Sequence, residues 1–299
     1  MILLTGATGF LGRHLLEGLL LKYGPEKIVA YTRTPIPGVK CVCHNGYESD
    51  SFEFVAMGLG DIDTILHAGA FTPKSKTESN NQELADLNVF VTNSLLKANL
   101  PNLKRFVYVS TIDVYAQAEV IDEATPISPS NAYAGSKMRG EELVSDWAKM
   151  HGKIGQVLRL GHVYGPGEER YRKVIPETMR RLRDRQNLQV FGAGKQHRAF
   201  IYVKDASSAI LAALDLERDI GPVNIAGGYR IRMIELINLM IEISGMQPEI
   251  EMVPSGEGQD MVVNTSKLQK YLLSDQKPLR EGLRLEWDYM KGRGNENPD

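Results

Sequence analysis

Short apolar runs alternate with stretches of helical periodicity through the first half of the chain. The runs lie at residues 2–4, 27–32, 64–69, 105–110 and 155–160, and their length and composition are typical of buried strands. Most of the segments between them place apolar residues three and four positions apart, as helices do. Strands alternating with helices predict a parallel sheet covered on both faces, in which ligands bind beyond the carboxyl ends of the strands.

The pattern changes after Arg159, where loop-like and mixed elements follow one another. The predicted elements are a loop at 161–170, a basic amphipathic stretch at 168–187, strands at 188–194 and 199–205, and helices at 205–217 and 233–245. The last of these helices ends at Gly245, a residue typical of helix C-caps.

The two halves together predict an α/β protein with two domains. Residues 1–160, with a returning segment near 200–217, would form a Rossmann-type doubly wound parallel sheet that binds a dinucleotide. Residues 161–299 would form a smaller C-terminal α+β domain that binds the substrate.

The stretch TGATGFLG, residues 5–12, lies where the first strand becomes the first helix. Its glycines, Gly6, Gly9 and Gly12, are three residues apart. Glycine permits positive φ and has no Cβ, so a ligand can approach the backbone N–H groups at the positive end of the helix. A dinucleotide is the expected ligand of such a turn. A tight β–α turn without a ligand would have the same glycines.

The charge composition predicts no general attraction for nucleic acid or an acidic membrane, because 35 Lys and Arg balance 37 Asp and Glu. The chain starts directly in the first strand, and no uncharged apolar stretch is long enough to cross a bilayer. We therefore expect a cytoplasmic protein with a small-molecule substrate and with neither a nucleic-acid nor a membrane partner.

The two cysteines, Cys41 and Cys43, lie two residues apart in a strand-like run. A disulfide between such neighbours would be strained, so we expect reduced thiols. His44 beside them invites a zinc site, but structural zinc needs four ligands and no second Cys/His cluster occurs in the sequence. We therefore predict no metal.

Residues 131–152 predict a helix that ends near Gly152 and carries Tyr133 and Lys137 one turn apart. A phenol with a pKa of about 10 is a poor proton carrier at neutral pH, but a nearby ammonium favours the phenolate. The pair therefore suits acid–base catalysis. A solvated Tyr–Lys pair on a helix surface is the alternative.

The strand at 105–110 ends on two hydroxyl groups, those of Ser110 and Thr111. A hydroxyl in this place could bond the same substrate oxygen that Tyr133 protonates or deprotonates, which would position it for transfer. A hydroxyl that merely terminates a strand is an equal alternative.

These segments together resemble the extended short-chain dehydrogenase/reductases, also called NAD-dependent epimerases/dehydratases. The resemblance covers nearly the whole chain, and its motifs follow the family's order: TGATGFLG, HAGA at 67–70, LNVFVTN with Asn88, VSTIDVY, NAYAGSK, LRLGHVYGPG and HRAFIYVKD. A single glycine motif is weak evidence. The glycine turn combined with Tyr133-x-x-x-Lys137 at this separation is specific.

The resemblance implies hydride transfer at a carbon that bears oxygen. Tyr133 would be the catalytic acid/base, Lys137 would lower its pKa and hold the nicotinamide ribose, and Thr111 would bond the reacting group. The other cofactor contacts that it implies are Gly6, Thr8, Gly9, Phe10, Leu11 and Gly12 in the turn, Ala68, Gly69 and Ala70 in HAGA, and Asn88. Arg198 matches a position that contacts the diphosphate of a nucleotide-sugar in many relatives, and Ser110 and His162 are further candidates for substrate binding.

The end of the second predicted strand departs from the usual pattern of NAD users, which carry a carboxylate there for the adenosine ribose. Here Thr32 stands in about that place and Arg33 follows it. Without the carboxylate the site no longer repels a 2′-phosphate, and the guanidinium attracts one. Arg33 therefore slightly favours NADP over NAD, unless it is a solvated loop residue.

Two further departures concern the substrate. Family dehydratases carry two acidic residues directly after the Thr of this strand end, whereas this chain has Ile112 and then Asp113. The general acid for elimination is missing, so dehydration is disfavoured. His162 occupies a place where many sugar-nucleotide enzymes have Asn, which weakens the assignment of a nucleotide-sugar.

Three functions compete. A nucleotide-sugar 4-epimerase would remove a hydride and return it to the other face of the sugar, using Tyr133, Lys137 and Thr111. An NADPH-dependent reductase of a keto-sugar or another carbonyl compound would use the same residues and is favoured by Arg33. A non-catalytic dinucleotide-binding protein would not need the Tyr–Lys pair.

An apolar stripe at helical spacing runs through Leu84, Leu87, Val91 and Leu95. The resemblance implies a homodimer in which this helix and the Tyr133 helix form a four-helix bundle. Core packing within a single chain would produce the same stripe.

Overall fold

The computed structural model describes residues 1–44, 54, 56–169, 171–254 and 260–292. The chain divides into two compact units. The first comprises Met1–Ala116, Glu123–Leu160 and Ser207–Ile225, and the second comprises Gln117–Asp122, Gly161–Ala206 and Ala226–Asp299. Among the described residues, no helix has the length and apolar character needed to span a membrane.

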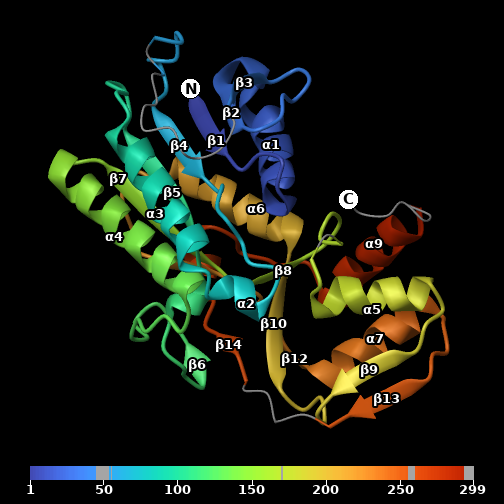
Figure 1. Ribbon diagram of the computed structural model, residues 1–299. Coiled ribbons are helices and arrows are strands. Elements are labelled where there is room, and N and C mark those ends of the chain that lie inside the picture. Colours follow the sequence, from blue (N-terminus) through green and yellow to red (C-terminus); the bar gives the residue numbers. More distant parts are fainter. Residues whose placement is uncertain (45–53, 55, 170, 255–259, 293–299) are drawn as a thin grey trace. The chain divides into compact units, whose positions relative to one another are not determined.

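A seven-stranded sheet forms the centre of the first unit (Figure 1). Its order is β11-β7-β5-β4-β1-β2-β3, and every neighbouring pair is parallel. The strands are β1 (Ile2–Thr5), β2 (Ile28–Thr32), β3 (Lys40–Cys43), β4 (Thr64–His67), β5 (Arg105–Thr111), β7 (Ile154–Leu160) and β11 (Val223–Ile225). The order reverses between β1 and β4, as in doubly wound dinucleotide-binding sheets. The predicted Rossmann-type fold is confirmed.

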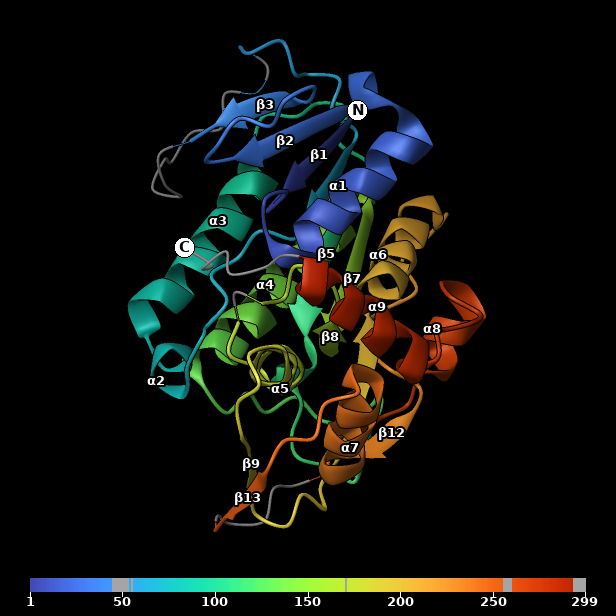
Figure 2. The same cartoon turned by 90° about the vertical axis from the view of Figure 1, so that its right-hand side faces the viewer.

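Helices cover both faces of this sheet (Figures 1 and 2). On one side α3 (Gln82–Lys97) packs against α4 (Ala132–His151), and on the other α1 (Phe10–Tyr23) contacts α6 (Val203–Ala212). A short helix, α2 (Lys76–Ser79), precedes α3. Because both faces are covered, every residue of β1, β2 and β4 is buried, without the alternation of a half-exposed sheet.

The ends of α4 follow local capping rules. The side chain of Asn131 accepts a hydrogen bond from the Ala134 N–H at 2.9 Å, and Gly152 closes the helix in the left-handed conformation with φ 61°. The predicted end at Gly152 is confirmed. Trp147 anchors the helix in the core, where Val91 and Leu95 of the predicted α3 stripe are also buried.

The second unit combines small sheets with helices. Its strands are β8 (His162–Tyr164), β10 (His197–Tyr202) and β12 (Arg230–Arg232) in one sheet, β9 (Leu188–Phe191) with β13 (Ile250–Val253), and β6 (Val120–Ile121) with β14 (Val262–Val263). Its helices are α5 (Val174–Arg183), α7 (Met233–Ser244), α8 (Ser266–Tyr271) and α9 (Leu279–Gly292). Helices α5, α7 and α9 pack against one another. The predicted C-cap at Gly245 is confirmed, with φ 68°.

Two predicted boundaries in this half were wrong. The segment at 161–170 contains the strand β8, which pairs in parallel with β10. Three residues are too few for a period to be detected, and the pairing partner is distant in sequence. The predicted strand at 199–205 ends at Tyr202, because β10 passes directly into α6 at Val203 without a turn residue.

Candidate functional site

The turn between β1 and α1 is closed so tightly that two of its three glycines have no room for a side chain. A Cβ on Gly6, whose φ is 75°, would lie 2.7 Å from Gly69 Cα, and a Cβ on Gly12 would lie 1.8 Å from the Gly6 carbonyl oxygen. Gly9 is the N-cap of α1 and offers no side chain that could cover the helix end. The N–H groups of a helix's first turn, here those of Leu11 and Gly12, have no carbonyl of the same helix in reach.

This cradle fits the pyrophosphate of a dinucleotide, since backbone N–H groups at a helix N-terminus bind anions. The predicted contact Thr8 is exposed beside the turn, and Phe10 is buried beneath it. The HAGA segment follows β4 and lies against the turn, as the short distance from Gly6 to Gly69 requires.

His67, the last residue of β4, holds this segment in place and was not predicted as a site residue. The Thr5 hydroxyl accepts the Gly69 N–H at 2.8 Å and lies 2.7 Å from His67 Nδ1. Thr92 donates to the Asn88 carbonyl, so it accepts the His67 Nε2–H at 3.1 Å, which leaves Nδ1 as an acceptor. Burial, with the charge of Lys137, lowers the pKa of His67 to about 3 and keeps it neutral.

Asn88 joins the same segment to α4. Its Oδ1 accepts the Phe71 N–H at 2.7 Å, and its Nδ2 donates to the Phe71 carbonyl and to Ser136 Oγ, both at 3.2 Å. Ser136 in turn donates to the Tyr133 carbonyl at 2.7 Å. The buried Asn88 therefore ties the loop after β4 to the helix that carries the predicted acid–base pair. A direct contact of Asn88 with a cofactor stays a prediction.

Tyr133 and Lys137 lie one turn apart on α4, and their environments differ. Tyr133 is half-buried, whereas the Lys137 side chain is 3% exposed. The Lys137 ammonium lies 4.2 Å from the centre of the Tyr108 ring, a cation–π contact. Burial lowers the pKa of Lys137 to about 7, and the charge of Glu141 partly opposes this. Lys137 is therefore no solvated surface residue.

The two hydroxyls at the end of β5 point to different partners. Ser110, 2% exposed, donates to Glu141 Oε1 at 2.5 Å. Thr111 accepts the Asp113 N–H at 3.2 Å and so begins the 3-10 turn Ile112–Val114. Neighbouring strand residues face opposite sides of a sheet. The donor proton of Ser110 is thus used inside the protein, and the geometry does not favour its predicted contact with substrate.

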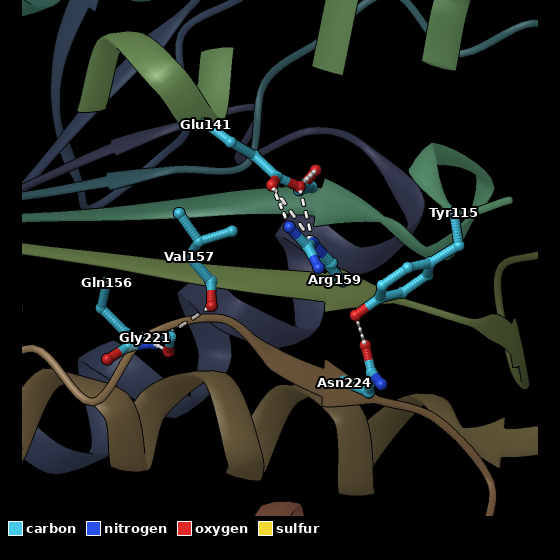
Figure 3. Close-up of polar contacts among 8 residues, drawn as sticks. Tyr115, Glu141, Gln156, Val157, Arg159, Gly221 and Asn224 are labelled. Carbon is cyan, nitrogen blue, oxygen red and sulfur yellow. Dashed lines mark hydrogen bonds and ion pairs between the residues drawn. The ribbon is translucent and has the colours of Figure 1, made fainter. Parts of the chain in front are cut away.

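A buried polar network lies behind these residues (Figure 3). Arg159 of β7 forms a forked ion pair with Glu141, with Nη2 to Oε2 at 2.6 Å and Nε to Oε1 at 3.1 Å. The guanidinium lies 4.6 Å from the centre of the Tyr115 ring, and Tyr115 donates to Asn224 Oδ1 at 2.8 Å. None of these residues was predicted to belong to the site.

The end of β2 carries a cation where a carboxylate was expected for NAD. Thr32 is buried, and its hydroxyl donates to the Thr34 carbonyl at 3.1 Å. Arg33 is exposed directly after the strand. The strand thus ends on a threonine and is followed by an arginine, and none of residues 32–34 is acidic.

The second unit contains a cavity of about 290 Å³ lined by His162, Lys173, Arg198, Phe200 and other residues. Burial lowers the pKa of His162 to about 4, so its ring is neutral, and its Nε2 has no hydrogen-bond partner among the described residues. Arg198 is half-buried. Lys173 pairs with the buried Glu168 at 2.9 Å. The cavity therefore offers Arg198, an imidazole and a Lys173–Glu168 ion pair to a ligand.

No group of three or more His, Cys, Asp or Glu in the described part of the chain could hold a metal ion. Cys41 is half-buried and Cys43 is exposed, and both are free thiols. The His44 ring stacks on Tyr31, with ring centres 4.3 Å apart.

Comparisons with known proteins point to one family. The model of the NAD dependent epimerase/dehydratase family matches residues 2–226. The fold is similar to that of UDP-glucuronic acid 4-epimerase from Bacillus cereus in complex with NAD, with a TM-score of 0.82 and 26% identity over 97% of this chain and 98% of that one.

Curated relatives include the uncharacterized UDP-glucose epimerase YtcB of Bacillus subtilis, which is 28% identical over 97% of both chains. A trifunctional UDP-glucose 4,6-dehydratase/UDP-4-keto-6-deoxy-D-glucose 3,5-epimerase/UDP-4-keto-L-rhamnose-reductase of Arabidopsis thaliana is 27% identical over 96% of this chain and 45% of its own length. The chain thus spans about half the length of that relative.

Proposed function

Since the chain belongs to the NAD dependent epimerase/dehydratase family of extended short-chain dehydrogenase/reductases, we propose that it is a nucleotide-sugar epimerase. It inverts a sugar carbon that bears a hydroxyl, the 4-position being the one named in the structural neighbours. The observation that carries this proposal is the buried Lys137 one turn from Tyr133, in the same unit as a glycine cradle that fits a dinucleotide.

Four residues of the first unit have a task in this proposed reaction. When bound, NAD or NADP would accept the hydride from the sugar carbon and return it. The Tyr133 phenolate takes the proton of the reacting hydroxyl and gives it back after inversion, while the charged Lys137 stabilises the phenolate. Thr111 bonds the reacting oxygen, and its neighbour Ser110 supports the site through Glu141.

The proposed binding of a nucleotide-sugar rests on residues of the second unit. Arg198 and Lys173 suit a diphosphate, because a guanidinium binds phosphate oxygens in a forked geometry. His162 donates or accepts one hydrogen bond from its neutral ring. UDP-sugars are the substrates named for the relatives. Dehydration, the activity of other relatives, is disfavoured because Ile112 follows Thr111 where an acid would be needed.

A second candidate, an NADPH-dependent reductase of a keto-sugar or other carbonyl compound, is favoured by one observation. Arg33 is exposed after β2, and no carboxylate stands at Thr32, so a 2′-phosphate would meet attraction and no repulsion. We propose NADP as the slightly preferred cofactor on this ground. NAD is the cofactor of the neighbours. Chromatography of the nucleotide released on denaturation distinguishes tightly held NAD from an empty, NADPH-binding protein.

The test of the proposed function is a panel of UDP- and dTDP-linked hexoses and hexuronic acids, each incubated with the protein and analysed by anion-exchange chromatography and NMR. The proposal predicts conversion of at least one sugar into its 4-epimer without consumption of added cofactor. Oxidation of NADPH with a keto-sugar in place of epimerisation would support the reductase.

The predicted homodimer and the cytoplasmic location remain proposals too. Leu84 and Leu87 are half-buried on α3, so part of the apolar stripe is left for a second copy of α3 and α4. Light scattering coupled to size-exclusion chromatography tests the dimer.

A further inference from the structure

Glu141 extends the acid–base pair by one more turn of α4. Residues four apart on a helix share one face, so Tyr133, Lys137 and Glu141 follow one another along the same side. Glu141 is buried, with 8% of the residue's surface exposed. Its two oxygens accept from Ser110 of β5 and from Arg159 of β7, as described above.

The partner of Glu141 is fixed just as firmly. Arg159 is 5% exposed and lies on the ring of Tyr115, which is held by Asn224 of β11. The nearest further carboxylate along this network is Glu123, which accepts the Asn224 N–H at 2.9 Å. A buried ion pair contributes little net stability compared with apolar residues of the same shape. We therefore look for the role of this pair in its electrostatic effect on a neighbouring residue.

That neighbour is Lys137. Tyr108 faces it from β5 and His67 from β4, and burial keeps both neutral, since it raises the pKa of Tyr108 and lowers that of His67. Tyr133 and Glu141 face it along α4. The negative charge of Glu141 opposes the cost of burying the ammonium.

Resting on the proposed function, we propose that Glu141 is a positioning residue that keeps the buried Lys137 charged beside Tyr133, and that Arg159 limits how strongly it does so. Ser110 fixes the carboxylate from the third side. The pair thereby sets how much positive charge Tyr133 meets, and so how readily its phenolate takes a proton from the substrate.

Two variants separate this role from a merely structural one, because they have opposite signs. Glu141→Gln removes the carboxylate that opposes the cost of burying the ammonium, so the pKa of Lys137 falls further. Arg159→Met leaves the carboxylate unopposed, so the pKa of Lys137 rises. We expect each shift to be about one pH unit or more, a tenfold change in the ratio of charged to neutral lysine.

The readout is NMR of the side-chain nitrogen of isotopically labelled lysine as a function of pH, with the Lys137 signal assigned by its loss in Lys137→Met. This measurement needs no turnover. Glu141→Asp keeps the charge and should titrate close to the wild type. Glu142→Gln is the matched control, since the next residue of α4 is exposed and pairs with Arg139; it should leave Lys137 unchanged.

Activity then follows the titration. In Glu141→Gln the loss of rate at alkaline pH moves to lower pH, and in Arg159→Met it moves to higher pH. The double variant Glu141→Gln/Arg159→Met lacks both charges and should return towards the wild-type profile. If one single variant does not fold, the sign of the other still decides.

The inference would be overturned if the pKa of Lys137 moved in the same direction in both variants, or if it moved in neither folded variant. Opposite shifts in a protein that epimerises no sugar would uphold the role of the pair and overturn the proposed function instead. If the protein epimerises a sugar but neither variant changes the pKa of Lys137, the proposed function stands and the role of the pair is overturned.

Discussion

Two buried carboxylates, Glu141 in the first unit and Glu286 in the second, differ in their hydrogen bonds, although the first unit also has buried polar atoms without a partner among the described residues, such as Tyr108 OH and Asn224 Nδ2. In the first unit Glu141 and Arg159 saturate each other, and Ser110 completes the network. In the second unit Glu286 is 0% exposed, yet neither of its carboxylate oxygens has a hydrogen-bond partner among the described residues, and His162 Nε2 also lacks one.

The contrast that bears on function is the one between Glu141, on the helix of the acid–base pair, and His162, which lines the cavity. Groups that hydrogen-bond one another are held in place before any ligand binds. Proton transfer requires the reacting groups to be positioned this precisely. A buried donor or acceptor without a partner costs free energy until something supplies one. For His162, which lines the cavity, a ligand can do so. Glu286 does not line it, so its cost falls on stability alone.

The sharpest way to test the reaction side is Tyr133→Phe, which removes one oxygen and leaves the helix intact. Loss of the acid/base should reduce kcat by about 10²- to 10⁴-fold, with cofactor binding retained. Tyr229→Phe, at an exposed tyrosine of the second unit, is the control and should be fully active. A Tyr133→Phe protein with more than a tenth of wild-type activity would remove Tyr133 from the mechanism.

The cofactor cradle should fail when its backbone contact is filled. Gly12→Ala places a Cβ 1.8 Å from the Gly6 carbonyl oxygen, so overpacking should destabilise the protein by about 1–3 kcal/mol and abolish cofactor binding. Calorimetric titration and thermal unfolding measure both effects. Gly135→Ala, where nothing lies within 4 Å of the new Cβ, should bind normally and unfold at a slightly higher temperature. Normal binding by Gly12→Ala would contradict the fit.

The recognition side is tested by Arg198→Ala. Loss of a charged hydrogen bond to the diphosphate should raise KM by about 10- to 100-fold with a smaller change in kcat. Arg230→Ala replaces an exposed arginine that lies opposite Ala199 in the neighbouring strand and should change neither constant. A fall in kcat alone in Arg198→Ala would assign this residue to the reaction instead.

The last prediction concerns Glu286 and changes stability, with no effect expected on turnover. Burial raises its pKa from 4.5 to about 8, with Glu168 and Glu169 adding to the shift. The folded protein therefore keeps a proton that the unfolded chain releases, and stability present at acidic pH is lost as the pH rises from about 4.5 to 8. Each unit of pKa corresponds to about 1.4 kcal/mol.

Glu286→Gln cannot titrate, so its free energy of unfolding should fall less steeply between pH 5 and pH 8 than that of the wild type. Asp288→Asn on the exposed side of the same helix should keep the wild-type slope. Denaturant titrations at several pH values measure both, and identical slopes for Glu286→Gln and the wild type would contradict the expected cost.

The parts of the site that the sequence predicted lie in contiguous motifs. The glycines at 6, 9 and 12 and the Tyr133–Lys137 spacing reveal themselves because turn geometry and helical period are local properties. Glu141 and Arg159 could not be predicted to pair, because a charged residue on a helix usually faces solvent and Arg159 lies 18 residues further on, in the next strand. Which of Ser110 and Thr111 can reach the substrate likewise could not be predicted, because it depends on which face of β5 packs against α4.

The second unit was harder to predict for the same reason. The strands β8, β12 and β14 have two or three residues each, and they are stabilised by pairing with distant segments and not by a pattern of their own. The helix that carries Glu286 gives no sign in the sequence that this carboxylate is buried.

The central claim is that a hydride leaves one carbon of the sugar and returns to the same carbon. It is tested most directly with a substrate deuterated at that carbon. The UDP-sugar that the panel identifies is incubated in water with the protein and unlabelled NAD or NADP, and both epimers are analysed by mass spectrometry. We predict that the 4-epimer retains the deuterium and that none accumulates in added cofactor. Loss of the label to water, or its transfer into free cofactor with a keto-sugar as product, would contradict the proposed epimerase.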